Sequence, residues 1–383
     1  MAIQARSPHF ETITSITTIS YGILQIYIWT GDENTVPSSP EYTLRKSVVT
    51  TSGLSTIIFE TAELIRDYLN VTFNGDYSGQ GVWVKHTLTI YDSSDSVITT
   101  RNTTNIAFDG YNYFEESSAS SPLMITNKKL FVLEDNAFRI PIYTESNPTV
   151  TFLKDNEIVS TQTFTSSSQS SEQIKYVSIY GNSTNWDSFK ERVLESGGTS
   201  FEPNKCLEAY FNEYSIGAVD KIVISDSSGI ETINVEILEE CKYEPKKVTF
   251  VNKFGALQDM YFFKKSVERM NVSKESYKSN ILTTISGVTG YSVDNHVYRD
   301  FNVMGKESVT LSSGFLSEDY NEVFKQMMLS EKVWVTNITD EGEQVLPINV
   351  KTSDITYKTS LNDKLVDYTF DFDKSFDTIN NIR

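Results

Sequence analysis

Cysteine and histidine are scarce in this sequence, and their scarcity excludes several kinds of chemistry. The two cysteines, Cys206 and Cys241, are too few for a disulfide framework or for a zinc site built from thiolates. They either pair across neighbouring strands or, as we expect for a chain made inside a cell, stay reduced and buried. The three histidines, His9, His86 and His296, are expected in different regions of the fold. The sequence therefore predicts no metal site and no cofactor.

Recognisable catalytic motifs are also missing. The chain has no Gly-X-Ser-X-Gly elbow, no P-loop and no Gly-X-Gly-X-X-Gly segment, which argues against nucleophilic hydrolysis and nucleotide chemistry. Asp371, Asp373 and Ser375 resemble the start of a calcium loop, but Phe376 stands where that loop requires glycine. We predict a non-enzymatic protein without catalytic residues. A glycosidase is the one enzymatic alternative left open, because it needs only two of the 51 acidic residues.

Long apolar runs and basic clusters are absent as well. The first residues, MAIQARSPHFETITS, contain no uninterrupted apolar segment of the kind found in a secretory signal, and no run approaches the roughly 20 apolar residues of a membrane span. We therefore expect synthesis in a cytoplasm and no membrane insertion. The formal net charge is −18, whereas binding along a nucleic-acid backbone needs clustered lysine and arginine. Direct nucleic-acid binding is not expected.

Residues that favour extended backbone are abundant. The chain has 22 Phe and 21 Tyr, and β-branched Thr, Val and Ile are also frequent. Both kinds suit the pleated, half-buried surface of a sheet. A length of 383 residues is enough for two or three domains. We predict a mainly β fold with two immunoglobulin-like or fibronectin-like β-sandwiches, at 1–118 and 123–244, followed by a β-rich C-terminal domain at 246–383.

Alternating apolar and polar residues mark the expected strands of the two sandwiches. In the first, the run from Ile13 to Trp29 is broken at Gly22, which indicates a strand pair or a bulged strand. Helical spacing at 61–69 predicts one short crossover helix. Further strands are expected at 42–49, 56–59, 71–73, 81–91 and 97–100, with a linker at 115–122. The second sandwich is expected to contain strands at 129–133, 138–143, 149–154, 158–164, 174–180, 221–225 and 230–238, and a helix at 186–196.

The C-terminal part opens on an aromatic-rich segment, KVTFVNKFGALQDMYFFKK (247–265). Gly255 fits a turn position with positive φ, so the segment is predicted to form a hairpin. Apolar residues at i, i+3, i+4, i+7 and i+8 from Tyr320 predict an amphipathic helix at 318–330, with Ser317 as its N-cap. An antiparallel meander follows, with strands expected at 332–337, 345–351, 355–358 and 364–372.

With its lead-in CKYEP (241–245) and its continuation to Tyr277, this segment resembles tail-associated structural proteins of tailed double-stranded DNA bacteriophages, particularly those of Bacteroidota hosts. The order of helix, VWV strand (333–335), charged turn (339–342) and final YTFDF strand resembles domains of phage tail and baseplate proteins. The resemblance extends by pattern from about Leu130 onward. It implies a virion protein of the tail, neck or baseplate, made in the host cytoplasm and assembled into a ring or collar.

The leading hypothesis is therefore a structural subunit that binds copies of itself and other virion structural proteins. Its candidate intersubunit contacts are Phe254, Tyr261, Phe263, Val333, Trp334 and Val335, although each of them taken singly is more readily explained as intramolecular core. The alternative is an adhesin that binds a receptor or a host surface glycan, either as a tail-fibre component or on a bacterial surface. Burial in a β core is the expected state of each tryptophan, but in an adhesin any exposed ones would stack on sugars, namely Trp29, Trp83, Trp186 and Trp334.

Overall fold

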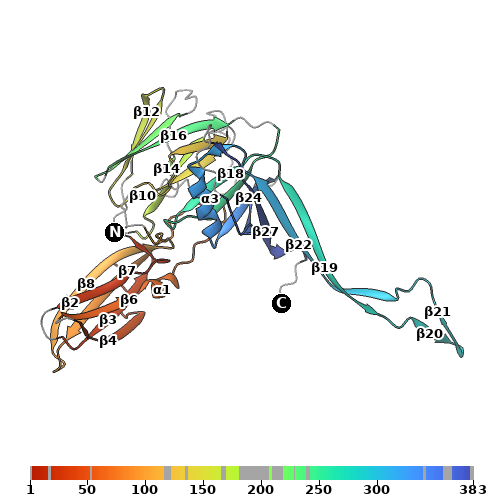
Figure 1. Cartoon of the computed structure of the whole chain (residues 1–383), viewed down its shortest axis with the longest axis horizontal. Coiled ribbons are helices and arrows are strands. Elements are labelled where there is room, and N and C mark those ends of the chain that lie inside the picture. The colour runs from red at the N-terminus through yellow and green to blue at the C-terminus, as the bar shows by residue number, and fades with distance from the viewer. Residues whose placement is uncertain are drawn as a thin grey trace.

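The protein is mainly β, as predicted. The computed structural model describes residues 2–15, 19–51, 54–115, 122–133, 137–164, 170–180, 207–208, 219–227, 229–238, 242–339, 342–356 and 365–379. Within them, three groups of β-strands follow one another along the chain, and a long two-stranded arm extends from the last group away from the rest of the molecule (Figure 1).

The N-terminal part consists of two sheets packed against each other. Its elements are β1 (Ile3–Gln4), β2 (Phe10–Ser15), β3 (Tyr21–Trp29), β4 (Tyr42–Ser47), β5 (Val49–Thr51), β6 (Leu54–Glu60), α1 (Ala62–Arg66), β7 (Val82–Tyr91) and β8 (Val97–Phe108). The order is β1-β8-β7-β3-β4 in one sheet and β2-β6-β5 in the other. Alternate residues of β3 and β7, such as Leu24 and Leu88, are buried with Phe59 of β6 between the sheets.

Most elements predicted for this part are confirmed, with two corrections. The chain leaves β2 at Ser15 and enters β3 at Tyr21, so Gly22 lies inside a strand and does not break one. A Cβ at Gly22 would lie 3.0 Å from Ile90 Cδ1, which explains why glycine suits this packed position. The segment 71–73 is not a strand, although Val71 and Phe73 are buried.

The second part contains all seven predicted strands. Its elements are β9 (Lys129–Leu133), β10 (Ala137–Tyr143), β11 (Thr149–Lys154), β12 (Glu157–Thr163), β13 (Ile174–Tyr180), β14 (Leu207–Glu208), β15 (Lys221–Ser225) and β16 (Ile230–Leu238). They form a sheet of order β12-β11-β15-β16-β9 and a sheet of order β10-β13-β14. The expected helix at 186–196, most of the expected linker, and both cysteines lie outside the described residues.

The C-terminal part is built on a seven-stranded sheet of order β18-β17-β24-β25-β27-β22-β19. The elements are β17 (Lys246–Val251), β18 (Leu257–Phe262), β19 (Val267–Lys278), β20 (Leu282–Ile285), β21 (Val288–Tyr291), β22 (Tyr298–Ser312), β23 (Leu316–Ser317), α3 (Tyr320–Leu329), β24 (Val333–Thr339), β25 (Gly342–Val350), β26 (Leu365–Val366) and β27 (Thr369–Asp377). The predicted hairpin is confirmed, because β17 and β18 pair around Gly255, whose φ is +79°.

The predicted amphipathic helix is confirmed as α3, but its cap is not. Asp319 occupies the N-cap position, and no side chain caps the helix, so the role expected for Ser317 is wrong. The strand expected at 355–358 is absent from its described residues, 355 and 356.

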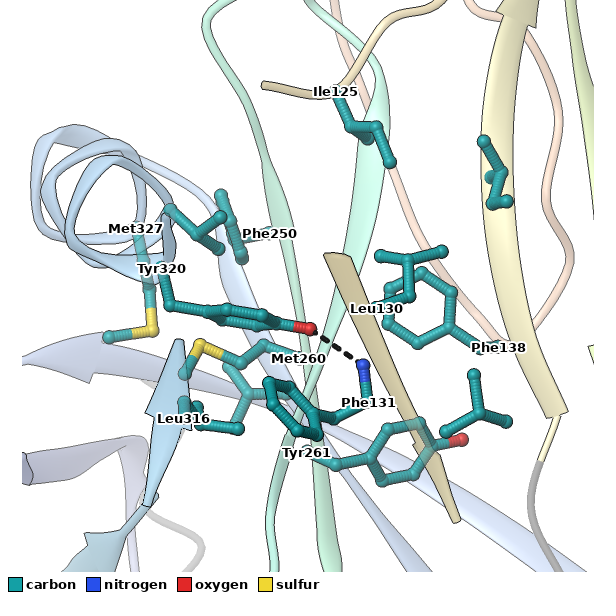
Figure 2. Packing of buried hydrophobic residues seen from close by; sticks show 14 of the residues in the cluster. Ile125, Leu130, Phe131, Phe138, Phe250, Met260, Tyr261, Leu316, Tyr320 and Met327 are labelled. Carbon is teal, nitrogen blue, oxygen red and sulfur yellow. Dashed lines mark hydrogen bonds between the residues drawn. The ribbon is translucent and has the colours of Figure 1, made fainter. Parts of the chain in front are cut away.

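One hydrophobic cluster runs through the second and C-terminal parts, from Leu123 to Phe372. Figure 2 shows where the two parts meet: Tyr320 of α3 packs beside Phe131 of β9, and its hydroxyl accepts a 3.1 Å hydrogen bond from the Phe131 amide. The boundary expected near residue 245 therefore falls inside a continuous core. A further cluster joins Phe108 of the N-terminal part to Tyr176 and Leu257, so all three parts share buried surface.

Candidate functional site

The six candidate interface residues belong to the interior of the chain. Tyr261, Phe263, Val333 and Val335 are buried in the cluster shared by the second and C-terminal parts. The two half-buried members, Phe254 and Trp334, pack against the cluster that joins all three parts. The four buried side chains offer little surface to a partner, which favours their alternative interpretation as intramolecular core, whereas Phe254 and Trp334 keep part of their surface exposed.

The exposed apolar surface lies instead on the arm, which we define as residues 267–303. It comprises β19, the tip hairpin of β20 and β21, and the outer part of β22, and it extends beyond the last pairing of β22 with β27 (Figure 1). Of the 26 large apolar side chains exposed among the described residues, 12 lie on this short segment. They are Val267, Met270, Val272, Tyr277, Leu282, Ile285, Val288, Tyr291, Val293, Tyr298, Phe301 and Val303.

A bulge divides the arm into a base and an outer ribbon. The register between β19 and β22 shifts between Ser273 and Glu275, and Asn302 opposite has a φ of +49°. Beyond the bulge, the rings of Tyr277 and Phe301 meet edge to face with centroids 5.7 Å apart. Cross-strand neighbours of this kind hold a two-stranded ribbon together where no further strand covers it.

The tip exposes apolar side chains on both faces. Leu282 pairs with Tyr291 and Ile285 with Val288, and side chains three residues apart on a strand point to opposite faces. Ser286 and Gly287 connect the strands, both with positive φ, as in a type I′ turn. A two-stranded hairpin is marginal alone in water, so a ribbon with apolar residues on both faces gains stability by binding another surface.

The base of the arm is anchored to the body. Lys374 of β27 donates a hydrogen bond to Glu307 of β22, and this contact lowers the pKa of the Glu307 carboxyl. Gly305 brings the strands close together, because a Cβ there would lie 2.6 Å from Met270 Cε and 3.3 Å from Thr378 Cβ. The root of the arm is therefore attached to the main sheet by both polar and close-packed contacts.

Sequence reasoning missed the arm, although one signal for it is present. The segment ILTTISGVTGY (281–291) places Ser-Gly between two β-prone runs, and this pattern is typical of a two-residue hairpin. The alternation of apolar and polar residues did not predict the arm, because alternation identifies strands with one buried face and a projecting ribbon has no buried face within its own chain.

The described tryptophans do not form a glycan platform. Trp29 and Trp83 are buried, and their indole N–H groups donate to the carbonyls of Asp32 and Gly31 at 2.8 and 3.0 Å. The Trp334 ring packs edge to face on Phe73. Trp186 lies outside the described residues. The burial expected for Trp29 and Trp83 is therefore confirmed, and neither ring offers a free face for stacking on a sugar.

Neither a membrane-spanning helix, in the part of the chain that the structure describes, nor a related protein points to another site. Neither helix of the described residues has the length and apolar character needed to cross a membrane. Searches of the chain against models of known protein families and against curated proteins gave no match.

Proposed function

We propose that this chain is a non-enzymatic structural subunit whose arm binds a second copy of the same chain. The single observation that carries the proposal is the concentration of exposed apolar side chains on the arm. Apolar patches of this kind on a soluble protein mark interaction sites, since their removal from water is favourable by about 25 cal/mol per Å².

The distribution of charge supports a second copy as the occupant. The arm has four basic and four acidic residues, which leaves 29 basic and 47 acidic residues for the remainder. Two bodies of this charge repel each other at close range, whereas a neutral ribbon is not repelled by an acidic body. About 12 residues separate the bulge from the tip turn, a reach of roughly 40 Å at strand spacing. The arm can thus join subunits whose bodies stay apart.

The edge of the main sheet supports the same assembly. β19 is the last strand of the seven-stranded sheet, so one side of its backbone is unpaired within the described residues. An edge of this kind can accept a strand from another chain. An arm that binds a different surface on its neighbour makes a head-to-tail contact, and repeated rotation closes such contacts into a ring.

The resemblance to tail-associated phage proteins supports a place for this ring or collar in a virion, in contact with other virion structural proteins. Protein mass spectrometry of purified particles tests this part of the proposal. We expect the chain in washed particles at a fixed ratio to the major tail protein, and its absence from them would refute the virion location.

Self-assembly is tested with two matched double variants. Ile285→Ser with Val288→Ser changes side chains that are 75% and 72% exposed at the arm tip. The control, Ile158→Ser with Ile230→Ser, changes side chains that are 68% and 72% exposed on β12 and β16 of the body. Both variants should fold, because neither touches a buried residue.

Sedimentation velocity across a range of concentrations gives the outcome. We expect the wild type and the control to form the same oligomer and the arm variant to associate at least about tenfold more weakly, since each buried Ile or Val contributes about 1.5–3 kcal/mol. A wild type that stays monomeric at high concentration, or equal weakening in both variants, would refute the role of the arm.

A further inference from the structure

Two histidines and a glutamate meet between the two sheets of the N-terminal part. His9 immediately precedes β2, Glu11 lies on β2, and His86 lies on β7 of the facing sheet. The expectation that the histidines lie in different regions is thus wrong for this pair, whose rings stack with centroids 5.7 Å apart. Sheet packing brings together residues that are far apart in the sequence.

The three side chains point their ligand atoms at one small volume. Glu11 Oε1 lies 3.2 Å from His86 Nδ1 and 3.9 Å from His9 Nε2, and the three atoms all lie within 4.8 Å of one another. Tetrahedral zinc with bonds of about 2.1 Å separates its ligand atoms by about 3.4 Å. The Glu11–His86 separation already fits this value. A small rotation of the partly exposed His9 ring would shorten its 3.9 Å separation from Glu11 Oε1 to the same value.

The polar atoms of this site are not satisfied by the protein. His86 is 1% exposed and its Nε2 has no hydrogen-bond partner among the described residues, whereas its Nδ1 lies 3.2 Å from Glu11 Oε1. His9 Nε2 is buried and also lacks a partner. Buried nitrogens of this kind normally find a partner, because each one left alone costs about 1–3 kcal/mol. The buried nitrogens of His9 and His86 lie beside the Glu11 carboxylate with their hydrogen-bonding capacity unfilled, which indicates a missing ligand.

The surroundings hold the carboxylate in place for such a ligand. The Arg101 guanidinium contacts Glu11 Oε2, and the Thr103 hydroxyl donates to Oε1 at 3.2 Å. Outer contacts of this type orient metal ligands in proteins.

We infer that His9, Glu11 and His86 bind one divalent transition-metal ion of the zinc class. Two imidazoles and a carboxylate are ligands that zinc and cobalt accept, with a water molecule in the fourth position. The ion would link β2 of the smaller sheet to β7 of the larger one. It would therefore stabilise the N-terminal part, independently of how the arm assembles.

Titration of the metal-free, full-length protein with Co²⁺ tests this inference, with the visible absorption of tetrahedral cobalt as the readout. We expect one equivalent to bind, Zn²⁺ to displace it, and Zn²⁺ to raise the thermal unfolding midpoint reversibly with a chelator. His9→Ala should weaken binding at least tenfold and remove the thermal shift. This variant changes the most exposed ligand, and circular dichroism confirms that it folds.

Two controls assign the ion to these residues. His296→Ala changes an exposed loop histidine and should bind cobalt like the wild type. Cys206→Ser with Cys241→Ser removes both thiols of the chain and should also bind normally. The inference is overturned if the wild type binds no cobalt, if His9→Ala binds it unchanged, or if loss of the thiols abolishes binding.

Discussion

The Tyr77 hydroxyl donates a hydrogen bond to Asp259 Oδ1, joining the N-terminal part to the C-terminal sheet across 182 positions of the sequence. Thr249 donates to the same oxygen at 2.8 Å, and the Arg139 guanidinium carbon of the second part lies 4.1 Å from the centroid of the Tyr77 ring. Burial and the adjacent Asp259 raise the pKa of Tyr77 well above its ordinary value, so the phenol remains a donor. The three parts of the chain therefore meet at one buried polar contact.

Tyr77→Phe removes this donor without changing the size of the ring. We expect it to lower the free energy of unfolding by about 1–3 kcal/mol, because a buried carboxylate loses one of its hydrogen bonds. Tyr21→Phe is the matched control, since Tyr21 donates to Asp95 at 2.9 Å on the exposed surface. Chemical denaturation should show almost no change for the control. Equal effects in the two variants would show that the buried contact does not hold the parts together.

Gly255→Ala tests the turn where the C-terminal hairpin contacts the N-terminal part. A Cβ there would lie 2.8 Å from Phe108 Cβ and 2.9 Å from the Asp109 amide nitrogen. Gly287→Ala imposes the same left-handed strain, at φ +78°, but meets no atom within 4 Å. Strain alone costs about 1–3 kcal/mol, so we expect Gly255→Ala to lower the unfolding midpoint clearly more than Gly287→Ala. Similar midpoints for the two variants would mean that the close packing at Phe108 contributes nothing.

Glu331 of the C-terminal part forms ion pairs with the N-terminal part whose contribution to stability depends on pH. Its carboxylate contacts Arg66 at 2.6 Å and Arg6 at 2.8 Å, and the hydrogen bond from Arg66, with help from Arg6, lowers its pKa from the ordinary 4.5. Because the pKa is lower in the folded state, the stabilisation is complete above about pH 4.5 and is lost as pH falls through the lowered value. Glu331 is largely exposed, so we expect a contribution of about 1 kcal/mol or less.

Glu331→Gln should therefore lower stability slightly at pH 7 and have a smaller effect at pH 3, when measured by chemical denaturation. The difference at pH 7 should shrink in high salt, which screens exposed ion pairs. A variant that loses the same stability at both pH values would contradict the electrostatic origin of the effect.

Local sequence patterns predicted the helices and strands of this fold well, but they did not predict which elements pack against one another. The hairpin at Gly255 and the helix from Tyr320 follow from turn chemistry and helical spacing, which are properties of neighbouring residues. The buried state of Tyr261 and Val335 follows from the packing of whole sheets. The sequence alone therefore could not decide between an intersubunit surface and an intramolecular core for these apolar residues.

The same limit explains the two sites that the sequence did not reveal. His9 and His86 meet only because β2 and β7 lie on facing sheets, and no spacing in the sequence encodes that pairing. Side chains of the arm alternate between two faces, as in any strand. This alternation does not show whether a face packs against the same chain, against another chain or is exposed to water.

The arm should change its sensitivity to trypsin when subunits assemble. It has cleavage sites at Lys274, Lys278 and Arg299, all exposed at or beyond the bulge, where no other described strand covers the ribbon. Such a ribbon opens locally at little cost, so dilute monomers should be cut there first. At concentrations that favour assembly, cleavage of the arm should slow at least several-fold, while cleavage at the exposed Lys154 of the body should not. Mass spectrometry of the early fragments measures both rates. If the arm and Lys154 respond alike to concentration, the arm lies outside the contact between subunits.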